Sequence, residues 1–435
     1  MSENPVDYQY PSDTPENLDT QETQATPETP EGHDADPPDT PSSHQTRVTM
    51  LTSVHSPFDT RIFYKEALTL VRAGYRVTLV CPHPHREEVQ GVRLVPLAYS
   101  GSRSKARTRT ASRSYPSPTG AGRLQRILLS PWRAFAQALR FPAPVYHFHD
   151  PELIPTGFLL RLLGKKVIYD VHENVSAQIT RKERLPAPQL LASLYRTLEL
   201  TACRLFALVL AEASYTRLYP ERTRKAVVQN FPQLEIFPSP TQAPEKYPTF
   251  TAGYLGGVSA IRGAERVLRA LGILKERGIP ANFVCIGPAS EEYAAYLQQL
   301  AEELEITDRV TFHGRMEAPA AYRILQQCHV GLAVLQPNPN YYHSFPTKMF
   351  EYMALGLPVI VSDFPLWRGV VDKAACGCTL DPTDPEALAD TLQTLAHNPS
   401  RAARLGENGR RAVEREYRWE KEAEKLLQLY QHLLT

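Results

Sequence analysis

The chain has 435 residues, which is too long for one ordinary domain and suits two domains that each bury a core. Hydrophobic residues make up 42% of the chain and charged residues 22%, the proportions of a globular protein and not of a fibre. The formal net charge of +1 conceals two opposed regions. Residues 1–46 contain eleven Asp or Glu and no Lys or Arg, so residues 47–435 carry about +12.

Several classes of protein are excluded by these patterns. No run of about 18 apolar residues occurs, so a membrane-spanning helix is not expected. The amino terminus is acidic and proline-rich, the opposite of a secretory signal. Six cysteines in so long a chain indicate no disulfide framework, and the pair Cys376 and Cys378 is too closely spaced for a zinc site. We therefore expect a cytoplasmic protein without a metal centre.

Residues 1–46 hold eight prolines and almost no aliphatic side chains. Such a segment cannot bury enough apolar surface to offset the entropy lost on ordering, so we expect a disordered tail. An alternative is that the acidic tail regulates binding by competing for the basic remainder of the chain.

Alternation of strand and helix patterns begins at Arg47. A β-branched strand pattern over 47–53 is followed by an amphipathic helix after Asp59 and a second strand over 76–81, which together indicate a βαβ unit. Further strands are predicted at 145–148, 166–171, 206–211 and 226–229. The proline-punctuated interval 230–248 is predicted to be a linker.

A second series of strands and helices follows the linker. Strands are predicted at 250–255, 281–286, 310–312, 330–335 and 358–361, with helices over 263–277, 290–304, 318–327, 346–355 and 384–397. Two such series predict an α/β protein with two Rossmann-like, doubly wound domains that face each other across a cleft. The predicted domains are residues 47–229 and 249–410, with a C-terminal helix at 411–435.

One segment of the first domain is strongly basic. From Val89 through His149 there is no Asp or Glu, whereas ten Lys or Arg occur. Residues 100–122, rich in Ser, Arg, Thr and Gly, are predicted to form a loop. Residues 123–135 mix basic and apolar side chains at helical spacing, which suits either attachment to an anionic membrane or a helix that packs within the domain. No nucleic-acid-binding motif accompanies the charge, so a nucleic-acid partner is not expected.

The segment from Ser344 to Asp363 is the strongest local signal for a binding site. It combines a loop, a helix that starts near Pro346 and a buried strand. Backbone N–H groups at a helix start attract anions, and Lys348 adds a positive charge there. Glu351, three residues later, lies on the same face and can accept hydrogen bonds from hydroxyl groups. The alternative is a surface ion pair between Lys348 and Glu351.

A second loop suited to phosphate joins the first strand and first helix of the second domain. Its glycines, Gly256 and Gly257 among them, let the backbone approach a ligand, and Arg262 can pair with phosphate. The loop lacks the G-x-G-x-x-G fingerprint, which disfavours a nicotinamide cofactor.

Polar residues also cluster just after predicted strands of the first domain, at the sheet edge that borders the expected cleft. They form three groups: His55 with Asp59 and Arg61; His147, His149, Asp150 and Glu152; and Asp170, His172 and Glu173. Three clusters at one edge indicate that at least one has a function.

These segments together resemble glycosyltransferase family 4, whose two-domain fold is called GT-B. The resemblance covers roughly residues 47–425. It rests on His55-Ser-Pro-Phe-Asp-Thr-Arg-Ile-Phe, His147-Phe-His-Asp-Pro-Glu, Tyr169-Asp-Val-His-Glu, Tyr254-Leu-Gly-Gly-Val-Ser-Ala-Ile-Arg-Gly and Pro346-Thr-Lys-Met-Phe-Glu-Tyr-Met-Ala.

The resemblance implies transfer of a sugar from a nucleotide diphosphate donor, such as a UDP- or GDP-sugar, with retention of configuration and without an obligatory metal or cofactor. The acceptor would be a glycan or a lipid-linked glycan, as in cell-surface polysaccharide synthesis at the inner face of the membrane. Independently of the resemblance, the basic and apolar pattern described above makes residues 100–140 the candidate for a peripheral contact with an anionic membrane.

The resemblance also assigns residues. Glu351 corresponds to the second glutamate of the family's Glu-x7-Glu motif, which holds the ribose, whereas His343 stands where the first glutamate is usual. The usual Arg and Lys at the diphosphate appear as Gly257 and Arg262, and Lys348 is the candidate replacement.

The implied roles fall into three sets. His172, Arg262 and Lys348 are expected to act in catalysis. The expected donor site is Gly256, Gly257, Arg262, His343, Ser344, Phe345, Lys348 and Glu351. The expected acceptor side is His55, Asp59, Arg61, His149, Asp150 and Glu173.

Two other functions stay open at this point. A nucleotide-sugar epimerase on the same fold would form product without an acceptor and would need further carboxylates for proton transfer. A binding protein that has lost turnover would bind nucleotide without releasing sugar, and the departures at His343 and Gly257 motivate that alternative.

Overall fold

The computed structural model describes residues 45–97, 120–180, 186–238 and 244–435. The predicted tail at 1–46 therefore lies outside the described residues except for its last two positions. Most of the predicted loop at 100–122 lies outside them too, although residues 120–122 are helical and not part of a loop.

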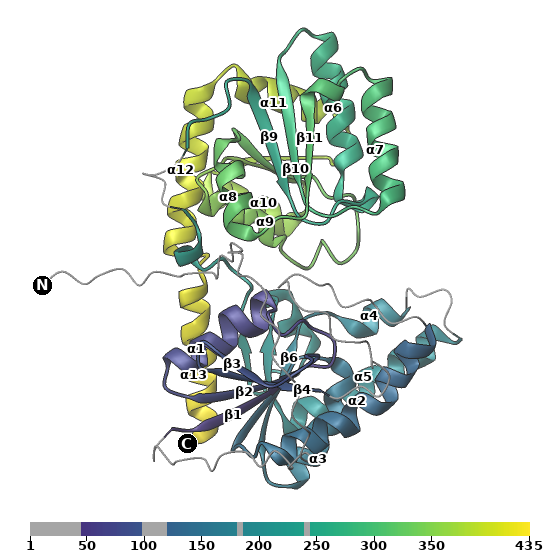
Figure 1. The fold of residues 1–435 in the computed structure, drawn as a ribbon, viewed down its shortest axis with the longest axis vertical. Helices are drawn as coiled ribbons and strands as arrows, with labels where there is room; N and C mark the ends of the chain where they lie inside the picture. The colour runs from purple at the N-terminus through teal and green to yellow at the C-terminus, as the bar shows by residue number, and fades with distance from the viewer. Residues whose placement is uncertain (1–44, 98–119, 181–185, 239–243) are drawn as a thin grey trace, which may run out of the picture. The chain divides into compact units, whose positions relative to one another are not determined.

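The first sheet has eight strands in the order β3-β4-β2-β1-β5-β6-β7-β8 (Figure 1). All neighbours are parallel except β3 and β4. The inner strands are runs of buried aliphatic residues because helices cover both faces. The strands are β1 (Arg47–Leu51), β2 (Arg76–Cys81), β3 (Glu87–Val89), β4 (Val92–Pro96), β5 (Val145–Phe148), β6 (Lys166–Val171), β7 (Ala207–Leu210) and β8 (Lys225–Val227).

The hairpin of β3 and β4 was not predicted. Its turn is made by Gln90 and Gly91, which both have positive φ (51° and 79°), as the tight two-residue turns of hairpins require. The three-residue β3 carries two glutamates and lacks the alternation that marks a longer strand.

The second sheet has six parallel strands in the order β11-β10-β9-β12-β13-β14. Its strands are β9 (Phe250–Leu255), β10 (Ala281–Ile286), β11 (Val310–Gly314), β12 (Val330–Ala333), β13 (Val359–Ser362) and β14 (Gly377–Leu380). Both predicted Rossmann-like domains are thus present. The edge strand β14 was missed because its half-buried sequence has no clear period.

Helices cover both faces of the second sheet, and these are α6 (Ala264–Glu276), α7 (Glu291–Glu303), α8 (Ala318–Gln327), α9 (Thr347–Ala354), α10 (Pro365–Ala374), α11 (Pro385–Ala396) and α12 (Pro399–Arg415). Buried side chains on its two faces form two separate core clusters. Helix α10 had not been predicted, although it buries Trp367 completely.

In the first domain, α2 (Gly120–Arg140), α3 (Ile154–Leu162) and α5 (Pro188–Leu205) pack on one face of the sheet. The other face is covered by the segment Thr60–Ala67, α1 (Leu68–Arg72) and the last helix. The short helix α4 (Val175–Thr180) contacts α5.

The segment Thr60–Ala67, here called η1, is a π-helix where an ordinary amphipathic helix had been predicted. Asp59 caps it, accepting hydrogen bonds from the N–H groups of Arg61 and Ile62. The wider spacing of a π-helix places residues five apart on one face, so Arg61 and Glu66 both point into the domain.

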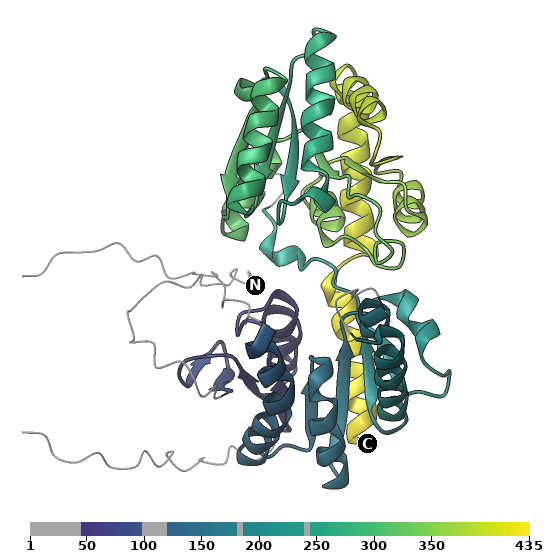
Figure 2. The ribbon, with the colours of Figure 1, turned by 90° about the vertical axis from the view of Figure 1, so that its right-hand side faces the viewer.

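The C-terminal region consists of two helices and not of the single helix predicted at 411–435. Helix α12 ends at Arg415 in the second domain, and α13 (Trp419–Leu434) packs against the first sheet (Figure 2). The fully or nearly fully buried Trp419, Leu426 and Tyr430 belong to the core of the first domain.

All six cysteines are free thiols, and five of them are buried. Within the described part of the chain, no helix combines the length and apolarity needed to cross a bilayer.

The packing of α13 predicts that the last helix stabilises the first domain. Leu426→Ala should lower the free energy of unfolding by about 2–5 kcal/mol, because it removes a fully buried side chain and leaves a cavity. Urea unfolding with Gln428→Ala as the exposed control on the same helix measures this effect. A loss of less than about 0.5 kcal/mol would show that α13 does not belong to that core.

Candidate functional site

Lys348 lies at the start of α9 and is buried. Its Nζ donates a hydrogen bond to the Tyr254 hydroxyl at 2.9 Å and lies 4.2 Å from the centre of the Tyr254 ring. The Tyr254 hydroxyl in turn donates to the carbonyl oxygen of Gly257 at 2.7 Å. These contacts join the helix start at α9 to the glycine loop after β9.

Gly256 shows why this loop needs glycine. Its φ of 132° is rare for residues with a side chain, and an added Cβ would lie 3.0 Å from Lys348 Nζ. Glycine therefore lets the backbone pass beside the lysine amine.

Arg262 ends a short 3-10 turn just before α6, and its guanidinium lies 5.8 Å from the centre of the Tyr341 ring. Burial and the nearby positive charge of Arg262 lower the pKa of Lys348 to about 7, although Glu351 opposes the shift. Two like charges are thus held close together, and the charge of Glu351 offsets only part of theirs. An arrangement of this kind favours a negatively charged ligand.

Glu351 is half-buried on the first turns of α9. Burial raises the pKa of its carboxyl, whereas the charges of Lys65 and Lys348 lower it. Lys65 comes from η1 of the first domain, and its amine donates to the side chain and the carbonyl oxygen of Asn230. The pair predicted from sequence, Lys348 and Glu351, is therefore not an isolated surface ion pair.

The loop before α9 contacts the first domain. The N–H of Phe345 donates to Glu212 Oε1 at 3.1 Å, and the Ser214 hydroxyl donates to the carbonyl oxygen of His343. The side chain of His343 is exposed, and Ser344 donates to the Asn340 carbonyl at 2.9 Å. Burial raises the pKa of Glu212 to about 8, although the N–H of Phe345 opposes the shift.

A second group of residues is built around Asp170, at the carboxyl end of β6. The buried Arg61 donates to both oxygens of Asp170, from Nε at 2.9 Å and Nη2 at 3.0 Å, and to the carbonyl oxygen of Val228 at 2.8 Å. Burial alone raises the pKa of Asp170, but the charge of Arg61 outweighs this effect and holds the pKa well below its usual value.

Asp170 also contacts two histidines. His149 Nδ1 lies 3.2 Å and His172 Nε2 lies 2.8 Å from Asp170 Oδ2. His149 is buried, whereas the side chain of His172 is 19% exposed. Asp170 therefore fixes the ring of the one histidine in this group that a ligand can reach.

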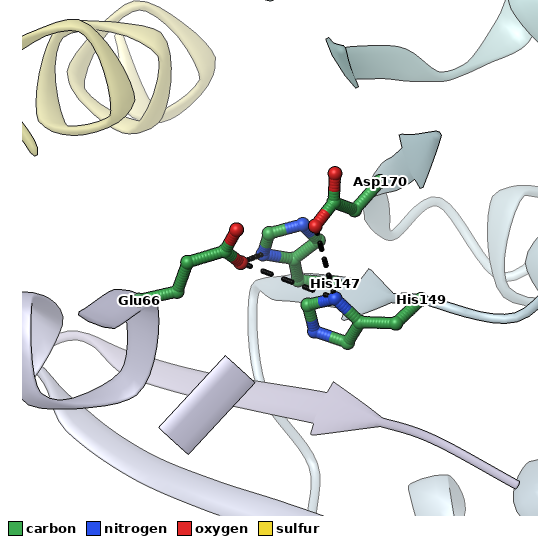
Figure 3. Close-up of side chains that lie close together, drawn as sticks. All are labelled: Glu66, His147, His149 and Asp170. Atoms are coloured by element: carbon green, nitrogen blue, oxygen red, sulfur yellow. Dashed lines mark hydrogen bonds and ion pairs between the residues drawn. The ribbon is translucent and has the colours of Figure 1, made fainter. Parts of the chain in front are cut away.

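Figure 3 shows the buried cluster of Glu66, His147, His149 and Asp170. Their ligand atoms lie within 4.8 Å of one another, a spacing that a metal ion could use. The Arg61 guanidinium, however, contacts both carboxyl groups, at 3.0 Å from Glu66 and 2.9 Å from Asp170. Since Arg61 already supplies the compensating positive charge, we do not assign a metal to this cluster.

His55 and Asp150 form a third contact at the same sheet edge. His55 Nδ1 lies 3.0 Å from Asp150 Oδ1, and Thr52 donates its hydroxyl to Asp150 Oδ2 at 2.8 Å. Burial lowers the pKa of His55, but the hydrogen bond and charge of Asp150 outweigh this effect and raise the pKa to about 9. The rings of His55 and His172 are 5.1 Å apart.

The structure thus brings four of the residues predicted for the acceptor side together with His172, which was predicted for catalysis, but their exposure differs. His55 and His172 are partly exposed, whereas Arg61, His149 and Asp150 are buried supports. The remaining two have local contacts, because Asp59 caps η1 and Glu173 accepts from Gln178.

Three residues of the candidate site had not been singled out from the sequence. Tyr254 lies within the glycine motif but was read as part of a strand, and Lys65 and Glu212 carry no motif. Glu212 follows β7 at the same sheet edge as the other clusters, which is the one signal that would have indicated it.

Comparison with known proteins gives a family match for the second domain. Residues 239–412 match the family model described as "Glycosyl transferases group 1". A D-inositol 3-phosphate glycosyltransferase from Corynebacterium urealyticum is 30% identical over 188 residues, which cover 42% of this chain and 43% of that protein. The alignment therefore spans less than half of either protein.

Solved structures resemble the chain over most of its length. Sucrose-phosphate synthase from Thermosynechococcus elongatus has a TM-score of 0.69 at 18% identity, covering 90% of this chain and 99% of that one. Anabaena HepE, solved in complex with UDP-glucose, has a TM-score of 0.63 at 12% identity, covering 89% and 100%. At these identities the likeness concerns the fold, and the predicted GT-B fold is confirmed.

The lowered pKa of Lys348 predicts that diphosphate binding depends on pH. An amine with a pKa of about 7 is mostly charged below pH 7 and mostly neutral above it, so affinity for a nucleoside diphosphate should fall between pH 7 and 9. The terminal phosphate of the ligand has a second pKa of about 6, so the little ionisation that it completes above pH 7 would raise the affinity and not lower it. Titration calorimetry on the wild type and Lys348→Met tests this.

Lys348→Met should bind weakly and with a much shallower pH dependence over the same interval, in which Lys65 also titrates because burial lowers its pKa to about 7. Lys275→Met, which removes a half-exposed amine from α6, is the control and should retain the wild-type profile. An equally steep profile in Lys348→Met would assign the titration to another group.

Proposed function

We propose that this protein is a retaining glycosyltransferase of family 4 that moves a hexose from a nucleotide diphosphate donor to a glycan or lipid-linked acceptor. The observation that carries the proposal is the juxtaposition of Lys348 and Arg262 beside the loop at Gly256. The match of residues 239–412 to glycosyltransferases covers the same part of the chain and supports it.

The proposed chemistry follows from where charge develops. When the bond between sugar and phosphate breaks, positive charge builds on the anomeric carbon and negative charge on the departing diphosphate. Lys348, Arg262 and the N–H groups at the start of α9 would stabilise the diphosphate, because fixed charges and dipoles act strongly where water is scarce. The diphosphate would also keep Lys348 protonated.

Glu351 would hold the nucleotide ribose through its carboxylate. Burial raises the pKa of this carboxyl, whereas the charges of Lys65 and Lys348 lower it and favour the ionised form. Lys65 would thus support the donor site from the first domain. His343 is exposed, so the donor sugar can reach its side chain, which would contact the sugar in place of the first glutamate.

His172 would face the transferred sugar from the first domain. Its Nε2 contacts Asp170, which leaves Nδ1 to contact a hydroxyl group of the transferred sugar or of the acceptor. We assign no general base. Attack from the front face, with the leaving phosphate accepting the acceptor's proton, requires none and retains the configuration.

The proposed donor is a UDP- or GDP-sugar used without a further cofactor or metal, and the proposed setting is cell-surface polysaccharide synthesis at the cytoplasmic face of a membrane. Among the named proteins of similar fold, HepE was solved with UDP-glucose. The two alternatives, an epimerase and a binding protein without turnover, have no specific observation in their favour.

A panel of UDP-, GDP- and ADP-sugars tests the proposal. We expect one donor to bind and to release its sugar slowly in the absence of acceptor, because the leaving diphosphate is stabilised in the same way when water is the acceptor. Chromatography of nucleotide and sugar products measures both events. Binding without release would favour the binding protein, and a changed sugar still attached to nucleotide would favour the epimerase.

Glu351→Gln tests how much the proposed ribose contact contributes to nucleotide affinity. The substitution keeps the shape of the side chain but removes its charge, and nucleotide affinity should fall on the order of tenfold, as expected for a charged hydrogen bond. Glu302→Gln, at an exposed position of α7, is the matched control. Unchanged affinity in Glu351→Gln would remove this residue from the site.

A further inference from the structure

Three helices of the first domain form one layer on its sheet. Helix α3 lies between α2 and α5 and contacts both (Figures 1 and 2). Their inner side is packed against the sheet by small and apolar side chains, among them Ala134, Ala138, Leu160 and Ala202. The packing interpretation of residues 123–135 is therefore correct for one side of α2.

The outer side of the same layer is apolar. It carries most of the large apolar side chains that are exposed among the described residues, and Leu162 (83%) and Trp132 (63%) are the most exposed of all. The set comprises Ile127, Leu128, Leu129, Trp132, Leu139, Leu162, Leu163, Leu190, Leu191, Leu194, Leu198 and Leu205. An exposed apolar surface of this breadth marks an interaction site.

The layer is also almost free of negative charge. Helices α2 and α3 contain no Asp or Glu, and α5 contains one, Glu199. Glu199 is buried and accepts from Arg196 at 2.7 Å, so it does not contribute a free negative charge to the outer side.

A basic cavity of about 810 Å³ opens at one end of this layer. Leu205 lines it, and Leu162 and Leu163 lie in the chain between two other lining residues, Arg161 and Lys166. Its basic side chains are Arg161, Lys166, Arg204, Arg222, Arg224 and His432, and no Asp or Glu is among the lining residues.

The position of the cavity separates it from the candidate donor site. It is built on the first residues of β6 and β7 and on the ends of α3, α5 and α13, whereas the site histidines follow the carboxyl ends of strands. Arg161 and Arg204 lie in the last turns of helices, where positive charge is stabilising in any protein. Lys166, Arg222 and Arg224 lie outside helices, and no ion pair is found for them among the described residues.

We propose that the outer side of α2, α3 and α5 docks on an anionic lipid bilayer, with a headgroup phosphate in the basic cavity and the leucines in the acyl region. Apolar side chains next to unpaired positive charges are complementary to such a surface, which offers hydrocarbon beneath negative phosphates. Nucleic acid would match the charge but not the leucines. The proposed surface comprises the described part of α2 from Ile127 onward together with α3, α5 and the cavity.

Sedimentation of the full chain with vesicles tests the proposal. The chain should bind vesicles that contain phosphatidylglycerol at low salt, bind poorly to vesicles of phosphatidylcholine alone and be released by high salt. Arg204→Gln combined with Arg224→Gln should weaken binding on the order of tenfold, since each removes a positive charge near the surface. Leu162→Ser combined with Leu163→Ser should weaken it to a similar extent.

Matched variants in the second domain provide the controls. Arg315→Gln combined with Arg323→Gln removes two exposed positive charges, and Phe312→Ser removes an exposed apolar side chain. Both should sediment like the wild type. Nucleotide-sugar binding should be unchanged in the α3 and α5 variants, so failure here is distinguishable from failure of the proposed function.

Four results would overturn the proposal. The first is no sedimentation with anionic vesicles, and the second is equal loss in the control variants. The third is binding of inorganic phosphate that depends on Arg204 and Arg224 without any vesicle binding, which would make the cavity a site for a soluble phosphate compound. A concentration-dependent dimer that Leu162→Ser abolishes, without vesicle binding, would likewise assign the leucines to a second copy of the chain.

Discussion

The buried ion pair between Arg61 and Asp170 organises the first domain around the candidate site. It connects η1 to the carboxyl end of β6, and Arg61 also donates to the carbonyl oxygen of Val228, directly after β8. Breaking a buried pair of this kind typically costs about 3–5 kcal/mol, because the remaining charge stays buried. Asp170 Oδ2, which accepts from Arg61 Nε, also contacts His149 and His172, so the position of His172 depends on a buried carboxylate.

In the second domain, the central feature is a pair of positive charges that can bind an anion. Lys348 is buried next to Arg262, and its partner Tyr254 offers a hydroxyl and a ring face but no negative charge. The lowered pKa of Lys348 is the consequence of this arrangement. Glycine at Gly256 is needed because the backbone runs directly beside the amine. On the account proposed here, the diphosphate supplies the missing negative charge.

Much of the fold could be predicted from the sequence, because long runs of aliphatic residues and helical periods dictate buried strands and their crossovers. The proximity of Arg262, Lys348 and Glu351 could be predicted as well, since these residues belong to local motifs. Lys65 and Glu212 could not, because they contact the second domain only through folding of the whole chain. Arg61 was placed on the acceptor side, but the π-helical spacing of η1 turns it inward. The return of α13 to the first sheet has no local signal at all.

A crystal structure with a bound nucleoside diphosphate tests the central claim most directly. The account predicts phosphate oxygens within hydrogen-bonding distance of Lys348 Nζ and the Arg262 guanidinium, and a ribose hydroxyl on the Glu351 carboxylate. A diphosphate bound elsewhere, with Lys348 still donating only to Tyr254, would contradict it.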